Sequence, residues 1–397
     1  MNNVDRFINY AKIDTQADDT THTSPSTEKQ KNLSRLLVFE LKELGISDAF
    51  MDEYGVVYGH LKGEGDKIGF NAHIDTALEV TNTGTNPRII KNYDGEDIKL
   101  NDKYVLSTKQ FPTLSKHIGH DLVVTDGNTL LGADDKAGIA IIMNALAFIV
   151  AHPEIKHKNI SVAFTCDEEI GEGADHFDLE KMNADYAYTI DGSEINCVDF
   201  ENFNAKAVHL HIKGVSVHPG EGKNALINAL LLANEFINLM PKNETPFDAG
   251  EDDGYWHLND FCGSSDECDL DMILRDFDKN SLDLRAISIQ KAVSDLQEKY
   301  PKAEFNLEIR DQYSNMRQYV ERNPKPLEVA KEALAKNGII ARPTKIRGGT
   351  DGATFSKMGL VTPNLGTGSY NHHGRYEYLD IQEFEKMINV VIDLMRN

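Results

Sequence analysis

The sequence predicts an α/β protein, a mixed sheet flanked by helices, with a smaller α+β unit inserted into it. Three observations support this fold class. Short apolar runs that end in polar residues alternate with long amphipathic segments, which is typical of strands and helices that share one sheet. Near residue 205 the pattern changes to alternating strands, and near residue 317 it changes back. The 397 residues also exceed one ordinary domain, so two domains are expected.

The larger domain is predicted to comprise residues 1–204 and 317–397. Helices are expected from amphipathic periodicity at 4–13, 27–44, 137–151, 325–337 and 381–395. Strands are expected around 68–72, 160–166 and 185–190, with a hairpin near 51–61. Residues 82–130 carry Pro, Gly and Asn between short alternating runs, which indicates a β-rich excursion from the main sheet.

Residues 205–316 are predicted to form a ferredoxin-like α+β unit. Strand-like alternation, helical periodicity and acidic turns follow one another in the order strand–helix–strand–strand–helix–strand. The clearest of these elements lie at 207–214, 223–240, 270–276, 282–299 and 303–310. One face of such a unit is able to pair with another subunit, so a homodimer formed through this domain is a further expectation.

The composition excludes several classes of partner. The formal net charge of −23 would repel nucleic acid and anionic membrane surfaces. No apolar run approaches the roughly 18 residues that a membrane span needs, and the N-terminus does not resemble a signal peptide. The four cysteines are too few for a disulfide scaffold, and we interpret them as thiols in a reducing cytoplasm.

An acidic cluster at a strand end is the first candidate for a functional site. Asp167, Glu168 and Glu169 directly follow the predicted strand around 160–166. Adjacent carboxylates repel, and burying them without a partner is costly. The cluster therefore indicates either a solvated turn or a bound cation. Neighbouring residues of an extended chain face opposite ways, so one glutamate could bind a metal while the other faces a substrate.

Further ligand-type residues occur at the ends of other predicted elements. His73 and Asp75 end one strand, and Asp191 ends another, at the sheet edge where α/β proteins bind ligands. Asp134 and Asp135 precede a helix, and the pair His372–His373 occupies a Gly-containing loop. Each motif alone is common on protein surfaces. Together they supply two imidazoles and three carboxylates for a pair of zinc ions, with one carboxylate left as a general base.

These motifs resemble those of the dizinc M20 metallopeptidase family. The matching segments are His73-Ile74-Asp75, Gly132-Ala133-Asp134-Asp135-Lys136-Ala137-Gly138, Asp167-Glu168-Glu169-Ile170-Gly171 and Asp191-Gly192. Further stretches are similar to the tripeptide aminopeptidases of this family: 200–205, 217–220, 273–278, 346–352 and 370–374. The resemblance runs from the first predicted helix to the last, and it implies a zinc-exopeptidase-like fold for the larger domain.

The resemblance also implies a set of metal ligands. His73 and Asp191 would bind one zinc ion, Glu169 and His373 would bind the other, and Asp134 would bridge them. Asp134 is preferred to its neighbour because the family pattern is Asp-x-Lys-x-Gly, and His373 is preferred to His372 because the ligand directly precedes Gly. The implied cofactor is two Zn²⁺ per chain, with Co²⁺ or Mn²⁺ as alternatives because nitrogen and oxygen ligands accept several metals.

The remaining implied roles concern catalysis and substrate binding. Asp75 would orient the metal-binding imidazole, and Glu168 would act as the general base. In the inserted domain, which would act as a lid, His218 would stabilise the oxyanion and Arg275 would bind the far end of the substrate. Without the family resemblance, His218 is more readily explained as a loop histidine and Arg275 as a salt-bridged surface residue.

The sequence therefore predicts a metal-dependent aminopeptidase that acts on short peptides, mainly tripeptides. One alternative is another hydrolase of the same family, such as a dipeptidase, carboxypeptidase or deacylase. A second alternative is a metal-binding protein without activity, but a retained Glu168 argues against it because a general base has no structural task. The side-chain preference at the cleaved residue, the native metal, and the roles of His372, Asp135 and Asp167 stay open.

Overall fold

The computed structural model describes residues 2–397 and shows two compact units. The first comprises the described residues up to Phe200 together with Met316–Lys345 and Thr350–Asn397. The second comprises Glu201–Asn315 and Ile346–Gly349. The short segment Ile346–Gly349 therefore groups with the inserted unit, although it lies far beyond it in the sequence.

The first unit is built on a mixed sheet, which has eight strands within residues 2–397. The strand order is β1-β2-β8-β3-β9-β16-β10-β15. Their bounds are β1 Phe50–Met51, β2 Val57–Leu61, β3 Lys67–His73, β8 Asn159–Thr165, β9 Tyr186–Gly192, β10 Cys197–Asn202, β15 Arg342–Ile346 and β16 Asn364–Gly366. The central strands β8, β3, β9 and β16 are parallel, whereas β2 and β10 pair antiparallel with β8 and β16. The predicted mixed α/β sheet is confirmed.

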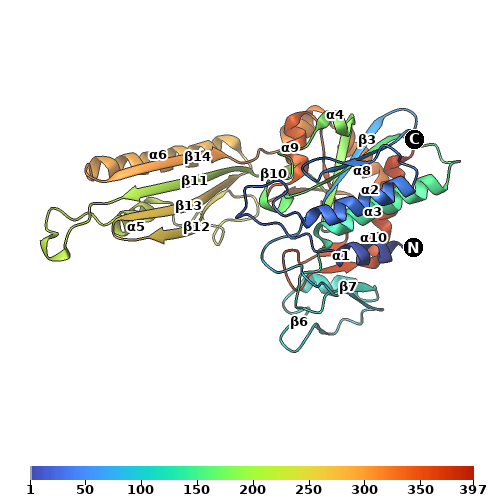
Figure 1. Cartoon of the computed structure of the whole chain (residues 1–397), viewed down its shortest axis with the longest axis horizontal. Helices are drawn as coiled ribbons and strands as arrows, with labels where there is room; N and C mark the ends of the chain where they lie inside the picture. Colours follow the sequence, from blue (N-terminus) through green and yellow to red (C-terminus); the bar gives the residue numbers. More distant parts are fainter. Residues whose placement is uncertain (1) are drawn as a thin grey trace. The chain divides into compact units, whose positions relative to one another are not determined.

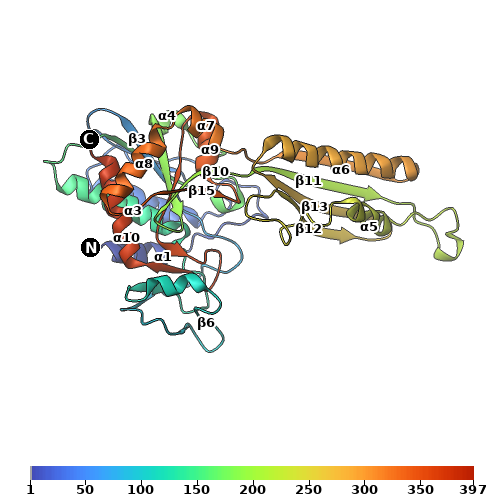
Figure 2. The same cartoon turned by 180° about the vertical axis from the view of Figure 1, so that it is seen from behind.

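Helices cover both faces of this sheet (Figures 1 and 2). Helix α3 (Ala133–Ala151) packs on β3 and β9, and α1 (Asn3–Ala11) and α10 (Ile381–Met395) pack on α3. Because α3 is apolar on almost all sides, it is buried between the sheet and these two helices. On the opposite face, α4 (Leu179–Met182) and α9 (Asp351–Met358) share an apolar core with β8 and β9. The other helices of this unit are α2 Gln30–Glu43, α7 Arg317–Arg322 and α8 Lys325–Lys336.

The β-rich excursion pairs with a segment near the C-terminus. It contains β4 (Arg88–Ile90), β5 (Ile98–Lys99), β6 (Val105–Leu106), the 3₁₀ helix η1 (Pro112–His117) and β7 (Leu122–Val124). Strand β7 pairs with β18 (Tyr378–Asp380), which in turn pairs with β17 (Ser369–Tyr370). The Nδ1 atoms of His117 and His120 lie 2.7 and 2.5 Å from Asp380 Oδ2. The segment that carries His372 and His373 is thus held at both ends by this small sheet.

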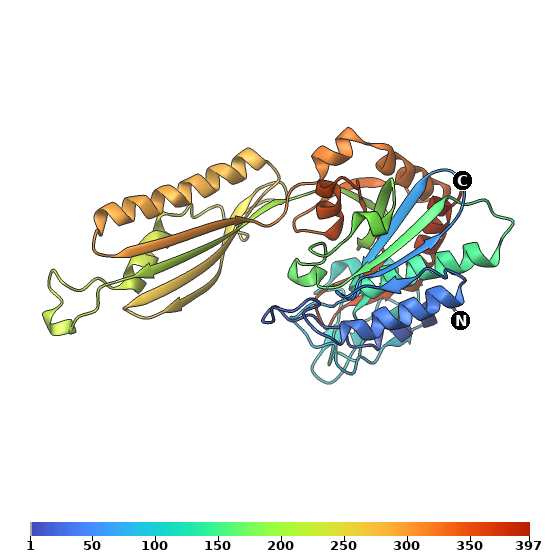
Figure 3. The same ribbon diagram turned by 45° about the horizontal axis from the view of Figure 1, so that its top comes forward.

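The second unit has the ferredoxin-like element order that the sequence predicts. The elements are β11 Asn204–Lys213, α5 Ala229–Leu239, β12 Tyr255–Gly263, β13 Glu267–Asp276, α6 Lys279–Lys299 and β14 Glu304–Asp311. All strand pairs in the sheet β12-β13-β11-β14 are antiparallel. Alternation along the strands buries Val208 and Leu210 against α5 and α6, whereas His209 faces outward. Figure 3 shows α6 lying along the sheet.

Some element boundaries differ from the predicted ones, for local reasons. Helix α5 begins at Ala229 instead of residue 223, because Pro219–Glu221 forms a 3₁₀ turn and Asn228 caps the helix through Leu231 N. The bounds of α3 include Asp134 and Asp135, but both have non-helical backbone angles, so the regular helix begins at Lys136, next to the predicted start at 137. Within residues 2–397, the structure contains no helix that is both long enough and apolar enough to cross a membrane.

Candidate dimetal site

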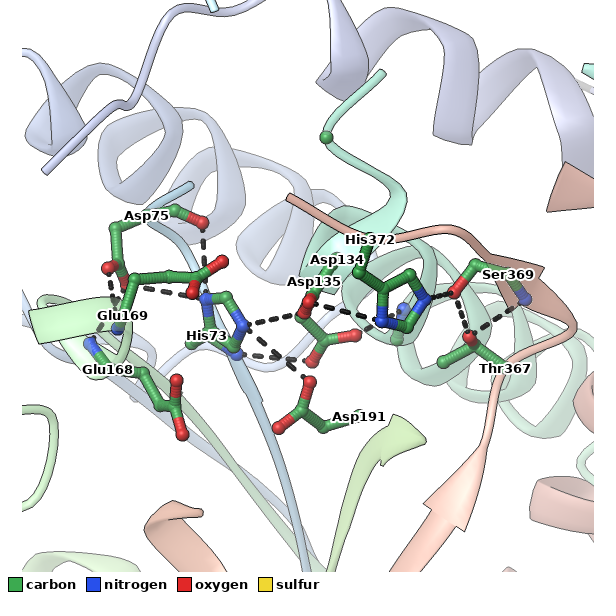
Figure 4. Close-up of polar contacts among 12 residues, drawn as sticks. His73, Asp75, Asp134, Asp135, Glu168, Glu169, Asp191, Thr367, Ser369 and His372 are labelled. Atoms are coloured by element: carbon green, nitrogen blue, oxygen red, sulfur yellow. Dashed lines mark hydrogen bonds and ion pairs between the residues drawn. The ribbon is translucent and has the colours of Figure 1, made fainter. Parts of the chain in front are cut away.

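The site lies where the parallel strands end, as the sequence predicts for an α/β sheet (Figure 4). His73 is the last residue of β3, Asp191 lies near the end of β9, and Asp134 lies in the non-helical first residues of α3. Glu168 and Glu169 follow β8 in the 3₁₀ turn η2 (Glu168–Ile170). The expectation of an extended chain at these two glutamates is therefore wrong. Their side chains nevertheless point in different directions, because successive residues of a 3₁₀ turn are rotated by about a third of a turn.

One group of potential ligands surrounds His73. Its Nε2 atom lies 3.0 Å from Asp134 Oδ1 and 3.6 Å from Asp191 Oδ1. The three donor atoms lie within 4.8 Å of one another. The His73 ring is 2% exposed, so the edge that faces the carboxylates is shielded from bulk water.

A second group surrounds His373 and shares Asp134 with the first. His373 Nε2 lies 3.0 Å from Glu169 Oε2 and 3.4 Å from Asp134 Oδ2. These donor atoms also lie within 4.8 Å of one another. One oxygen of Asp134 thus faces each group, which is the placement that a bridging carboxylate requires. Both groups have the composition that the family resemblance implies.

Asp75 connects His73 to the two glutamates of the acidic turn. Its side chain is fully buried, and its two carboxylate oxygens accept hydrogen bonds from Glu168 N and Glu169 N, both at 3.1 Å. His73 Nδ1 lies 3.1 Å from Asp75 O and 3.3 Å from Asp75 Oδ1. Asp75 therefore fixes the ring orientation of His73 and the backbone of both glutamates at once, which leaves Nε2 of the ring to face the ligand groups.

The charge balance of the site calls for cations. Burial, and then the neighbouring Asp134, raise the pKa of Glu169 to about 7, and burial raises the pKa of Asp191 to about 7 and the pKa of Glu168 well above its usual value. Glu169 Oε1 is buried and has no hydrogen-bond partner among the described residues. An orphaned carboxylate oxygen in a cluster of imidazoles and acids fits a hard or borderline divalent cation, which would relieve the repulsion. The residues present therefore fit a pair of divalent metal ions.

The three residues whose roles the sequence leaves open have structural contacts. Asp135 is buried and accepts hydrogen bonds from His73 N and Gly138 N. His372 Nδ1 lies 3.3 Å from Asp134 Oδ2, and Nε2 of the same ring lies 2.8 Å from Ser369 Oγ. His372 is thus a neighbour of the shared carboxylate, but it is not part of either of the two ligand groups that contain Asp134.

Asp167, the third open residue, turns away from the ligand groups. It is 2% exposed and has a left-handed backbone, with φ of 65°. Its carboxylate accepts hydrogen bonds from Ser26 N at 2.7 Å and from Gln30 Nε2 at 2.6 Å. Asp167 therefore ties the acidic turn to the start of α2, and the cluster Asp167-Glu168-Glu169 divides into one structural carboxylate and two that face the site.

The two predicted substrate-binding residues belong to the second unit. His218 is exposed, and its Nδ1 accepts a hydrogen bond from Gly220 N at 3.1 Å. Arg275 is 9% exposed; its Nη1 donates to Gln312 Oε1 at 2.9 Å, and its guanidinium lies 5.2 Å from the centre of the Tyr313 ring. The guanidinium of Arg275 is thus held in a defined position within its own unit.

Comparison with known proteins places the chain in a family. A family model described as peptidase family M20/M25/M40 matches residues 120–397. This match covers more than half of the chain and includes Asp134, Glu169, Asp191 and His373. The chain belongs to peptidase family M20/M25/M40. Its resemblance to this family, noted from the motifs, is thereby confirmed.

Curated relatives extend the similarity over nearly the whole chain. A protein named peptidase T from Clostridium perfringens is 44% identical over 396 residues, which is 99% of this chain and 98% of that protein. A peptidase T from Shouchella clausii is 46% identical over 395 residues, with coverage of 98% and 97%. The similarity includes the N-terminal part that carries His73 and Asp75.

Solved structures show the same fold. The crystal structure of the aminopeptidase PepT from Bacillus cereus aligns with a TM-score of 0.77 at 22% identity and covers 99% of this chain and 97% of that one. A tripeptidase from Staphylococcus aureus aligns with a TM-score of 0.79 at 20% identity, with coverage of 99% and 96%. A Bacillus subtilis protein described as a dinuclear metal-binding peptidase of the M20 family aligns with a TM-score of 0.66 at 14% identity, with coverage of 99% and 96%.

Three buried charged residues near the site escaped prediction from the sequence. Asp351 is 5% exposed and accepts a hydrogen bond from Thr165 Oγ1 at 2.6 Å, beside the end of β8. Lys136 is fully buried, and Glu377 is 1% exposed. The available signal was a charged side chain inside an otherwise apolar or Gly-rich stretch, but that pattern does not reveal which backbone groups such a residue will meet.

Proposed function

We propose that this protein is a metal-dependent aminopeptidase that releases the N-terminal residue from tripeptides. The observation that carries the proposal is the pair of ligand groups sharing Asp134, with Glu168 beside them and in neither group. The similarity to proteins named peptidase T over nearly the full chain supports the choice of substrate. So do the fold similarities to an aminopeptidase and a tripeptidase.

The proposed ligands follow from the two groups. His73 and Asp191 would hold one divalent ion, Glu169 and His373 the other, and Asp134 would contact both. When bound, these ions supply positive charge that polarises the scissile carbonyl and makes water a stronger acid near neutral pH. We propose zinc in both positions, with cobalt or manganese as alternatives, and elemental analysis of the purified protein would identify and count the ions.

Glu168 is the proposed general base. Its backbone amide is fixed by Asp75 Oδ1 at 3.1 Å, while its side chain extends away from the carboxylate of Glu169. Glu168 would accept a proton from the attacking water and then deliver it to the leaving amine. Burial raises the pKa of Glu168 and neighbouring positive charge lowers it; the balance of the two would allow the carboxyl group both to accept and to release a proton near neutral pH.

Glu168→Ala tests this role against that of a ligand. We expect turnover to fall by about 10²- to 10⁴-fold, the usual contribution of a general base, with the metal content unchanged. Glu172→Ala, which removes an exposed glutamate from the same turn region, is the matched control and should keep both activity and metal. Loss of metal from Glu168→Ala would show that this residue is a ligand instead.

His218 and Arg275 are the proposed substrate-binding residues of the second unit. His218 would donate to the developing oxyanion, and Arg275 would pair with the carboxylate of a short peptide. Arg275→Lys keeps the charge but loses the planar fork, so we expect KM to rise for a free tripeptide and to change little for its C-amidated form. An equal change for both substrates would argue against a carboxylate contact.

Substrate modification separates the proposed activity from its alternatives. An aminopeptidase should cleave a free tripeptide and fail on its N-acetylated form. A carboxypeptidase would instead be blocked by C-amidation, a dipeptidase would prefer dipeptides, and a deacylase would act on the N-acyl group. Cleavage of the N-acetylated tripeptide as fast as the free one would refute the aminopeptidase proposal, and absence of any hydrolysis by the metal-loaded protein would favour a metal-binding protein without activity.

Two further predictions from the sequence accompany this proposal. We propose a homodimer formed through the second unit, to be checked by sedimentation at several concentrations of the full-length protein. A cytoplasmic location is also proposed, supported by the four cysteines, all of which are free thiols among the described residues. Fractionation of cells that produce the protein would check the location.

A further inference from the structure

A buried carboxylate joins two loops of the site that are far apart in the sequence. Glu377 is 1% exposed, and all the hydrogen bonds that its side chain accepts from described residues come from main-chain amides. Its Oε2 atom accepts from Leu131 N at 2.8 Å and from Gly132 N at 2.7 Å. Its Oε1 atom accepts from Asp134 N at 2.9 Å.

These amides belong to the loop that leads into helix α3: Leu131 and Gly132 precede the helix, and Asp134 has non-helical backbone angles. A buried main-chain amide outside regular secondary structure needs an acceptor from elsewhere. A carboxylate is the strongest acceptor available for such donors. Asp135 Oδ1 accepts from Gly138 N at 3.1 Å, so the first turn of the regular helix has a local acceptor. Glu377 supplies an acceptor for the loop amides before it, from a distant part of the chain.

The same segment also contacts the side chain of Asp134. His373, four residues before Glu377, places Nε2 3.4 Å from Asp134 Oδ2, and His372 places Nδ1 3.3 Å from the same oxygen. Segment 372–377 therefore holds Asp134 at two points, the backbone through Glu377 and the carboxylate through the imidazoles. A rotation of the backbone at residue 134 would swing the carboxylate away from one of its two ligand groups.

We propose that Glu377 is a positioning residue that holds the backbone at Asp134, so that its carboxylate serves both metal positions at once. This inference rests on the proposed role of Asp134 as the shared ligand. It goes beyond that role, because the hydrogen bonds that the Glu377 side chain accepts from described residues come from main-chain amides, Asp134 N among them, and none comes from the side chain of a ligand residue. It also accounts for the glutamate in the sequence His373-Gly374-Arg375-Tyr376-Glu377, which the metal site alone does not require.

The geometry makes Glu377→Gln an informative variant. Glutamine has nearly the same shape, but only one of its two terminal atoms accepts hydrogen bonds. Its amide group would face either Asp134 N or the amides of Leu131 and Gly132, so that two donors meet on at least one side. Glu383→Gln is the matched control, because Glu383 is a partly buried glutamate that accepts from Tyr370 Oη at 2.6 Å and makes no contact with the 131–134 loop.

Two measurements need no catalytic activity. In the metal-free protein, we expect hydrogen exchange at the amides of Leu131, Gly132 and Asp134 to become at least about 10-fold faster in Glu377→Gln, because hydrogen bonds to a charged acceptor are stronger than those to a neutral one. The same amides should be unchanged in Glu383→Gln. In competition with a chromogenic chelator, the zinc affinity of Glu377→Gln should fall by about 10- to 100-fold, as is usual for outer-shell residues.

Catalysis supplies a third measurement, at saturating zinc. For a free tripeptide we expect kcat to fall by about 10-fold or more while KM stays within about twofold, because Glu377 does not face the substrate. If Glu377→Gln is less heat-stable but keeps wild-type zinc affinity and kcat, the residue is only structural and the inference is overturned. Glu377→Asp, which reaches only one side of the loop, should give intermediate values, and it decides the matter if the glutamine variant does not fold.

The inference and the proposed function fail in different ways. If the wild-type protein binds two zinc ions but does not hydrolyse tripeptides, the proposed function is refuted. The amide hydrogen exchange and the zinc affinity of Glu377→Gln still test the role of Glu377 in that case, because neither measurement needs catalytic activity. If the wild-type protein hydrolyses tripeptides and Glu377→Gln behaves as the wild type in all three measurements, the inference is overturned and the function stands.

Discussion

Lys136 offers a sharp test of how burial controls charge in this molecule. Its side chain is fully buried beside the site, and Nζ donates to Ile13 O at 2.7 Å and to Asn82 Oδ1 at 2.9 Å. Neither partner is a carboxylate. Burial is the main cause that lowers the pKa of Lys136 from 10.5 to about 7, and the more distant Asp14 and Glu377 offset it only in part.

The lowered pKa predicts a definite pH dependence of stability. Between pH 7 and 10.5 the unfolded state binds a proton at this lysine that the folded state has lost, so the free energy of unfolding rises with pH across that window. Each pKa unit corresponds to about 1.4 kcal/mol, and the window from pH 7 to pH 9 should therefore contribute roughly 2 kcal/mol. Below pH 7 the contribution no longer changes.

Lys136→Met isolates this contribution. The variant removes the hydrogen bonds that Lys136 donates to Ile13 O and Asn82 Oδ1. This loss changes the free energy of unfolding by the same amount at every pH. We expect the difference in unfolding free energy between the wild type and the variant to shift by roughly 2 kcal/mol in favour of the wild type from pH 7 to pH 9. The assay is urea unfolding of the metal-free proteins, with Lys42→Met on the exposed side of α2 as control. A difference that stays constant with pH, or shifts the other way, would refute the reasoning.

Two further predictions concern the frame of the site. Asp75→Asn keeps one acceptor oxygen where the amides of Glu168 and Glu169 use two. Zinc affinity, measured by chelator competition, should therefore fall by about 10- to 100-fold. An unchanged affinity would show that the turn keeps its conformation without Asp75. Gly138→Ala would place a Cβ 1.8 Å from Ile190 O, so that α3 must shift from β9, and urea unfolding should show a loss of about 1–3 kcal/mol; an equally stable variant would contradict this close packing.

Much of the fold follows from patterns that are local in the sequence. Helices α2, α8 and α10 lie within a few residues of their predicted positions, because each carries a complete amphipathic repeat. The strands β3, β8 and β9 were predicted because each is a short, mainly apolar segment that ends in polar residues. The strands β16, β17 and β18 were not predicted, because they have only two or three residues and are defined by their partners.

The residue types that can bind metal were also predicted from the sequence, because His, Asp and Glu recur directly after strand-like runs. His73, Asp134, Glu169, Asp191 and His373 were singled out in this way and from the family resemblance, and the structure brings them into two groups. Their roles as ligands stay predictions until metal is measured. The left-handed turn at Asp167 and the 3₁₀ turn at Glu168 were not foreseen, because both depend on contacts with residues elsewhere in the chain.

The sequence by itself determined the fold class, the order of the elements and the residue types that can bind metal. Only the tertiary structure showed which groups surround each carboxylate. The sequence left the role of Asp167 open until Ser26 and Gln30 were placed against it, and it gave Glu377 no role until its oxygens were found to accept from the amides of the loop before α3. A carboxylate has the same chemistry wherever it stands in the chain. Its role is set by the donors, cations and water around it, and those come from segments that only folding brings together.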